Sequence, residues 1–126
     1  MWYIIVKKEG EIKMNFYDKV YELVRCFKDT EEYKKYISLK NEIKKENKTA
    51  EMLKEFKEKQ MKLQTEYINT GKMNESMQKE LENTYSLLIQ SEKARSFLEA
   101  EIRLNVLLAD MQKIIGEGIK EIVEFE

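Results

Sequence analysis

The chain has 126 residues, of which 42% are hydrophobic and 37% are charged, with no proline and four glycines. This composition is typical of long solvated helices, and a chain of this length has room for one modest core. The net charge of -1 excludes an overall field that would attract nucleic acid or an anionic membrane. No segment approaches the roughly 18 apolar residues of a membrane span, and the single cysteine forms no intrachain disulfide. We therefore expect a cytoplasmic protein.

Residues 1–13 (MWYIIVKKEGEIK) differ from the rest of the chain, because an aromatic and β-branched cluster precedes a polar Lys/Glu/Gly stretch. A strand here would have no obvious partner in the chain, and a lone strand is unstable. The codons AAG-GAG-GGN for Lys8-Glu9-Gly10 would contain a bacterial ribosome-binding sequence upstream of Met14. We therefore expect translation to start at Met14, which N-terminal mass spectrometry of the native protein tests, and residues 1–13 to be an atypical extension.

Two amphipathic helices are predicted before residue 47. In the first, Asn15 is the expected N-cap, and apolar residues recur at the i, i+3, i+4, i+7 spacing of one face, at Val20, Leu23, Val24 and Phe27. In the second, a cap at Asp29-Thr30 is followed by acidic residues that suit the helix dipole. This second helix is predicted to end near Glu46.

A helical hairpin is predicted between residues 50 and 89. Thr49 is the expected cap of a helix over 50–69, in which Leu53, Phe56, Gln60, Leu63 and Tyr67 step by three and four, close to a heptad seam. Gly71 is suited to end that helix, and Asn74 to begin the next, over 75–89. A short loop between two long helices predicts an antiparallel pair.

The last predicted helix, over 92–115 with Ser91 as its cap, is apolar on far more than one face. Such a helix must be buried on several sides, and five helices of this size do not easily enclose it within one subunit. We therefore expect a two-fold dimer, the commonest oligomer, although burial within the monomer is the alternative. The expected interface residues are Phe97, Leu98, Glu101, Ile102, Leu104, Leu108, Met111 and Ile115. Residues 119–126 form a C-terminal tail whose conformation the sequence does not decide.

The residues for catalysis are missing. Histidine is absent, which excludes Ser-His and Cys-His nucleophilic sites and His-containing zinc or di-iron sites. We therefore predict no enzyme activity, no cofactor and no metal site within the chain. Cys26 is interpreted as an inert small core residue, with one ligand of a cluster shared with other chains as the alternative. Glu101, flanked by apolar residues, is expected to be held by a hydrogen bond or an ion pair at the subunit interface.

The charge is uneven along the chain. Residues 28–62 hold 11 Lys/Arg against 8 Asp/Glu, and residues 63–126 hold 7 against 12, which gives +3 and -5. These are ordinary polar helix faces, or else the first half carries a basic surface for RNA or for an acidic partner. Tyrosines among the lysines could stack on single-stranded RNA, but they more often form the edge of helix packing.

Several segments between Tyr17 and Gly118 carry a family resemblance. They are Tyr17-Asp18-Lys19 leading to Leu23-Val24, Thr30-Glu31-Glu32-Tyr33-Lys34-Lys35-Tyr36, Phe56 with Gln60 and Gln64, Phe97-Leu98-Glu99-Ala100-Glu101-Ile102-Arg103, and Ala109-Asp110-Met111-Gln112-Lys113-Ile114-Ile115-Gly116. The two blocks in the last helix are the most specific. With them, the chain resembles the YlbF/YmcA family of small helical bacterial proteins, and residues 14–118 are the predicted family domain.

The resemblance implies a non-enzymatic regulator. It implies action in protein complexes that influence RNA processing, and through it competence, sporulation and biofilm formation. The alternative is direct RNA binding through the Lys-rich second and third helices. The fold expected is all-α, with about five helices, an antiparallel hairpin or bundle, a long apolar C-terminal helix and a dimeric assembly.

Overall fold

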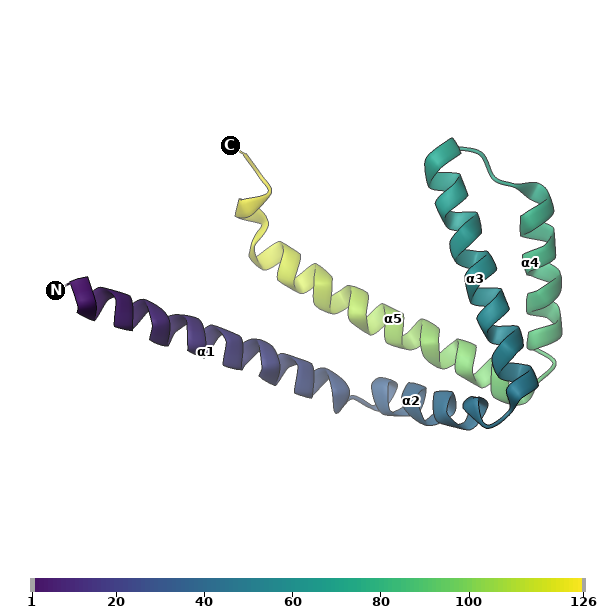
Figure 1. Cartoon of the computed structure of the whole chain (residues 1–126), viewed down its shortest axis with the longest axis horizontal. Helices are drawn as coiled ribbons and strands as arrows, with labels where there is room; N and C mark the ends of the chain where they lie inside the picture. The colour runs from purple at the N-terminus through teal and green to yellow at the C-terminus, as the bar shows by residue number, and fades with distance from the viewer. Residues whose placement is uncertain (1, 126) are drawn as a thin grey trace. The chain divides into compact units, whose positions relative to one another are not determined.

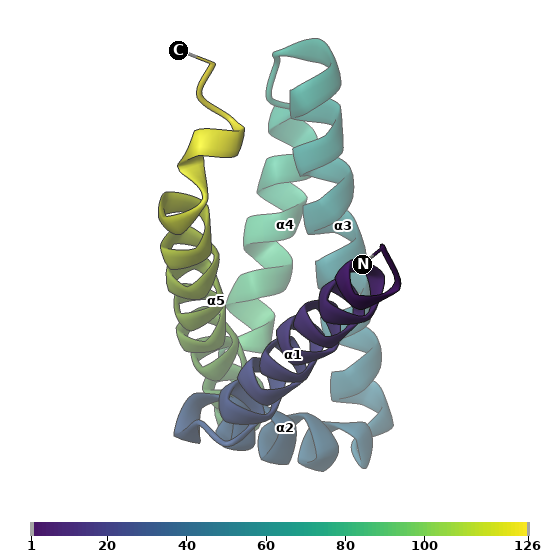
Figure 2. The same cartoon turned by 90° about the vertical axis from the view of Figure 1, so that its left-hand side faces the viewer.

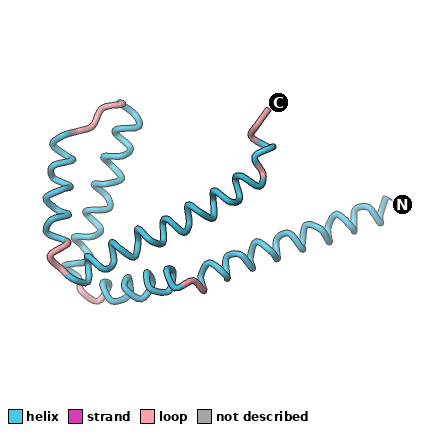
Figure 3. The backbone as a smooth tube through the Cα atoms, turned by 180° about the vertical axis from the view of Figure 1, so that it is seen from behind, coloured by secondary structure: helices cyan, strands magenta, loops and turns pink. Residues whose placement is uncertain are grey.

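The computed structural model describes the backbone of residues 2–125 and the side chains of residues 10–125. Within that part it is all-α, as predicted, and contains no strand (Figures 1 and 3). The elements are α1 (Trp2–Lys28), α2 (Glu31–Lys44), α3 (Asn47–Thr70), α4 (Glu75–Leu88), α5 (Glu92–Gly118) and a 3-10 turn (Lys120–Ile122).

The chain divides into two compact units after Lys34, and the first consists of α1 and the start of α2. Because α1 begins at Trp2, the prediction that Asn15 caps this helix is wrong: Asn15 lies in the helix interior. The predicted apolar face of α1 is largely uncovered, since Val20, Leu23 and Val24 are each more than 40% exposed. Cys26 is also exposed, so its interpretation as a core residue is wrong.

The start of α2 was predicted correctly, and the start of α3 was not. The Thr30 hydroxyl accepts a hydrogen bond from the Tyr33 amide at 3.3 Å, which caps α2. The second helix of the chain ends at Lys44, and α3 begins at Asn47 rather than after Thr49. Thr49 therefore lies inside the first turn of α3, where its hydroxyl donates to the carboxylate of Glu46 at 3.3 Å.

The predicted hairpin is present in the second unit, where α3 and α4 lie side by side (Figures 1 and 2). Gly71 ends α3 with φ 71°, in the left-handed region that favours glycine, and its amide donates to the Tyr67 carbonyl. Asn74 caps α4 by accepting from the Met77 amide at 3.1 Å. Ser91 caps α5 in the same way, by accepting from the Ala94 amide. The predicted helix end at Gly71 and the predicted caps at Asn74 and Ser91 are therefore confirmed.

We expect Asn74→Ala to lower the free energy of unfolding by about 1 kcal/mol, because the first turn of α4 loses its side-chain acceptor. Urea denaturation measures this. Asn83→Ala is the matched control, since Asn83 is exposed in the middle of α4 and alanine favours a helix there. An Asn74 variant as stable as the Asn83 variant would contradict the role of the cap.

The core of the second unit lies where α2, α3, α4 and α5 meet. Each helix contributes buried side chains to one cluster, namely Ile43, Leu53, Phe56, Leu88, Ala94, Phe97 and Leu98. Tyr36 adds a ring stacked on Phe97, with 5.3 Å between the ring centroids. Since all four helices bury an apolar face at one junction, this cluster positions α5 relative to α2 and α3.

Candidate functional site

The eight expected interface residues divide into two groups along α5. Phe97 and Leu98 are 7% and 8% exposed and belong to the core of the subunit. Glu101 is half-buried beside them and forms an ion pair with Lys57 of α3. The apolar side of the first two turns of α5 is thus buried within the subunit. Glu101 was predicted to be held at a subunit interface, and in the structure its ion-pair partner belongs to α3 of the same chain.

The other residues on α5 are more open. Leu104, Leu108 and Met111 are half-buried, and Ile115 is 45% exposed. These four residues step by four, three and four, so they form one line along the helix, here called the α5 stripe. Figures 1 and 3 show that α5 leaves the α3–α4 hairpin as it runs toward Gly118. Ile102, also expected at the interface, is 62% exposed and points away from the stripe.

A groove of about 440 Å³ lies where α2, α3 and α5 meet. Its polar lining is Tyr36, Lys40, Lys44, Lys54, Lys57 and Glu101, and we call it the lysine groove. Its apolar lining includes Ile43, Leu53 and Phe97. Among residues 10–125, no carboxylate forms an ion pair with Lys40, Lys44 or Lys54. The groove therefore combines an apolar wall with three positive charges not engaged in ion pairs.

Tyr36 lies in the wall of this groove, and its ring has two neighbours. One face stacks on Phe97, and the Lys40 ammonium lies 5.9 Å from the ring centroid. Burial raises the pKa of Tyr36, and the nearby carboxylate of Glu101 raises it further. Tyr36 is therefore a neutral group whose ring is already stacked on Phe97.

The sequence indicated the lysine surplus of residues 28–62 but not the groove. Lys40 and Lys44 are one helical turn apart on α2, and Lys54 and Lys57 are one turn apart on α3. That spacing alone predicts that each helix presents two lysines on one side. The fact that both pairs of lysines face Phe97 and Glu101 of α5 depends on how the helices cross, which no local pattern specifies.

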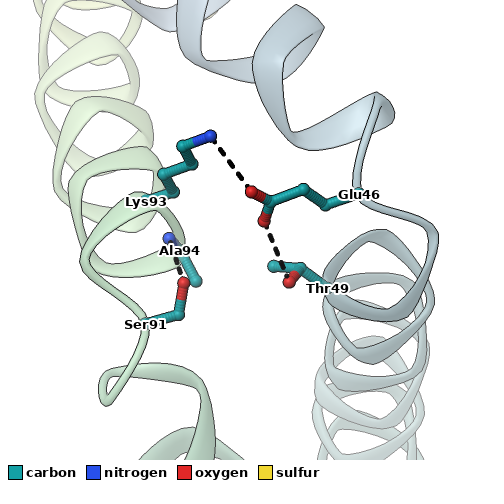
Figure 4. Close-up of polar contacts among 5 residues, drawn as sticks. All are labelled: Glu46, Thr49, Ser91, Lys93 and Ala94. Atoms are coloured by element: carbon teal, nitrogen blue, oxygen red, sulfur yellow. Dashed lines mark hydrogen bonds and ion pairs between the residues drawn. The ribbon is translucent and has the colours of Figure 1, made fainter.

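A polar junction fastens the linker between α2 and α3 to the start of α5. The Lys93 ammonium lies 3.0 Å from a carboxylate oxygen of Glu46, whose other oxygen accepts from Thr49 (Figure 4). The hydrogen bond from Lys93, together with its positive charge, lowers the pKa of Glu46 below its ordinary value. The same pair raises the pKa of Lys93.

These shifts predict a pH dependence. The lowered pKa of Glu46 contributes stability above the ordinary glutamate value of about 4.3, and that contribution is lost as pH falls through the lower folded value. We expect the wild-type melting temperature to fall more steeply than that of Lys93→Met between about pH 5 and pH 3. Lys79→Met, which removes an exposed lysine of α4, is the control. The prediction would be contradicted if the melting temperature of Lys93→Met fell as steeply as that of the wild type between about pH 5 and pH 3.

The structure is that of an all-helical protein with a basic groove between α2, α3 and α5 and a line of partly open apolar residues on α5. Among residues 10–125, no group of three or more His, Cys, Asp or Glu side chains is placed to hold a metal ion. No helix in the described part is both long and apolar enough to cross a membrane. Residues 16–120 match the family model described as control of competence regulator ComK, YlbF/YmcA. The chain belongs to this family, which is one of regulators and not of enzymes.

The relatives agree with that assignment. A UPF0342 protein of Symbiobacterium thermophilum is 36% identical over 103 residues, covering 82% of this chain and 92% of the relative. UPF0342 proteins of Desulfitobacterium hafniense and Halothermothrix orenii are 34% and 32% identical, covering 87% and 85% of this chain and 89% and 91% of the relatives. The similarity therefore extends over most of both chains in each pair.

Proposed function

We propose that this protein is a non-enzymatic regulator that acts as a homodimer within a cytoplasmic protein complex. The observation that carries the proposal is the α5 stripe, a line of three half-buried apolar side chains and one exposed one on a helix whose other end packs in the core. Exposed apolar surface in line on one helix is a usual mark of a protein interface. The complex would modulate RNA processing and, through it, competence, sporulation and biofilm formation.

The spacing of the stripe supports a two-fold, antiparallel pairing of α5 with α5 of a second copy. In such a pair centred between Ala109 and Asp110, Leu104 meets the partner's Ile115 and Leu108 meets the partner's Met111. The four positions thus pair among themselves, as a self-complementary two-fold interface requires. Their four-three-four spacing is that of a heptad seam.

Affinity purification from the native host tests the regulatory role. A tagged chain is expected to recover components of an RNA-processing complex, including proteins associated with a ribonuclease. The Leu108→Glu variant serves as a control that separates partners bound through the dimer from partners bound elsewhere. Recovery of no ribonuclease-associated protein by the wild-type chain would count heavily against the proposal.

The rival function is direct RNA binding through the lysines of α2 and α3, and the observation that favours it is the lysine groove. A gel shift with mRNA over a range of salt concentrations separates the two functions. Electrostatic binding to RNA must weaken steeply as salt rises. The absence of a shift at low salt would remove the rival.

A further inference from the structure

The segment that follows α5 is acidic and apolar at once. Residues 119–125 hold two glutamates and one lysine. Within the described part of this segment, the apolar side chains are open to solvent: Ile122 is 79% exposed, Val123 is 84% exposed and Phe125 is fully exposed. Residues 119–125 are here called the acidic tail. Apolar side chains left this open between carboxylates indicate a segment suited to a basic surface with an apolar wall.

The lysine groove has the complementary chemistry. Its rim carries Lys40, Lys44 and Lys54, which form no ion pair within the described residues, and its wall is apolar. Lys57 is already neutralised by Glu101. The same carboxylate repels phosphate, and the Tyr36 ring is already stacked on Phe97, so the groove suits a protein segment better than RNA.

The groove and the tail of one chain lie at opposite ends of α5. From Glu101 to Gly118 the helix rises about 26 Å. The seven residues of the acidic tail span at most about 25 Å when fully extended, and three of them form a 3-10 turn. A return to the groove of the same subunit would therefore require the turn to unwind and the whole segment to stretch along α5.

The proposed dimer, on which this inference rests, brings the tail of the second copy to the groove. In an antiparallel pair centred between Ala109 and Asp110, the partner's Gly118 stands opposite Glu101. At this same level α3 contacts α5 of its own chain, where Lys57 forms an ion pair with Glu101. The partner's helix must end there to avoid α3, and α5 does end at Gly118. The residues that follow are then directed past Phe97, a residue of the groove wall.

We propose that the acidic tail of each copy occupies the lysine groove of the other copy in the dimer. Glu121 and Glu124 of the tail pair with Lys40, Lys44 or Lys54, and the apolar tail residues cover the wall formed by Ile43, Leu53 and Phe97. The two exchanged tails fix the register of the α5 stripe, because each tail reaches its groove at only one alignment of the two helices.

Zero-length carbodiimide cross-linking of the full chain tests the exchange. Equal amounts of unlabelled and ¹⁵N-labelled chains are mixed, allowed to exchange subunits, cross-linked and digested for mass spectrometry. We expect mixed-isotope links from Glu121 or Glu124 to Lys40, Lys44 or Lys54. The Lys57–Glu101 link, which lies within one chain, carries a single isotope and is the internal control.

The possible results distinguish failure of the tail exchange from failure of the proposed dimer. A dimer by sedimentation equilibrium with no tail-to-groove link overturns the inference and leaves the proposed dimer standing. Tail-to-groove links that never join the two isotopes after complete subunit exchange place the tail in the groove of its own chain and also overturn the inference. A chain that is monomeric at all concentrations overturns both the inference and the proposed dimer.

Charge reversal provides a second measurement. We expect Lys54→Glu to raise the dimer dissociation constant about three- to tenfold at low salt, with a smaller effect at high salt. Lys62→Glu is the matched control, since it makes the same change on α3 outside the groove. If Lys54→Glu leaves dimerisation unchanged but abolishes binding of single-stranded poly(U), the groove is an RNA site and the inference is overturned.

Discussion

Leu108→Glu is expected to convert the proposed dimer into a folded monomer. Leu108 is only half-buried within its own subunit, so a carboxylate there can still reach water when the subunits separate. In the antiparallel pair it would face the partner's Met111, and a buried, unpaired charge costs several kcal/mol. About 3 kcal/mol corresponds to a rise of about 100-fold in the dimer dissociation constant. Sedimentation equilibrium measures that constant, and circular dichroism checks the helix content.

Val106→Glu is the matched control for this variant. Val106 lies two residues before Leu108, about 200° away around the helix, and it is 56% exposed. The same chemical change on the opposite face of α5 is therefore expected to leave the dimer intact. A Leu108→Glu chain that remains a folded dimer by light scattering would refute the assignment of the α5 stripe as the interface.

Leu88→Ala is expected to lower the free energy of unfolding by about 3 kcal/mol. Leu88 is 1% exposed and belongs to the cluster that joins the four helices of the second unit. Truncation of a buried leucine removes its transfer free energy and leaves a cavity, with a typical loss of about 2–5 kcal/mol. Since whole proteins are stable by only about 5–15 kcal/mol, this loss lowers the urea midpoint markedly.

Leu87→Ala tests whether the position or the residue type causes that loss. Leu87 precedes Leu88 on α4 and is 57% exposed, so its truncation is expected to change stability little. Both variants are compared at one protein concentration, because the proposed dimerisation would make apparent stability depend on concentration. Equal losses in the two variants would contradict the placement of the core at this junction.

The helices themselves were predictable from the sequence because their signals are local. Apolar spacing by three and four identified the helix faces, and the caps at Asn74 and Ser91 and the turn at Gly71 each need only a few neighbouring residues. The same preference misled at Asn15 and Thr49. An Asn or Thr side chain can cap a helix, but here α1 starts before Asn15 and α3 starts before Thr49. A cap preference of about 1 kcal/mol does not decide where a helix begins when the helix can extend past it.

The surfaces were harder to predict because they depend on how helices cross. The apolar character of residues 92–115 predicted burial, but it did not show that Phe97 and Leu98 lie in the core of the subunit while Ile115 is open. The lysine groove combines side chains of α2, α3 and α5, and none of these helices carries it alone. Sequence periodicity gives the face of each helix, whereas the pairing of faces follows from the tertiary fold.

Because α5 is one continuous helix, a change of its orientation at one end displaces the other end. Ala94 and Phe97 in its first turns are packed in the core, and the α5 stripe begins at Leu104, two turns after Phe97. Phe97 and Ile115 are about 27 Å apart along the helix axis, so a tilt of about 10° at Phe97 would move Ile115 by about 5 Å. A ligand or partner that wedges the helices apart near Phe97 would thus shift the contact between two copies at a distance. Small adjustments at the junction of α2, α3 and α5 would become large ones in the proposed dimer.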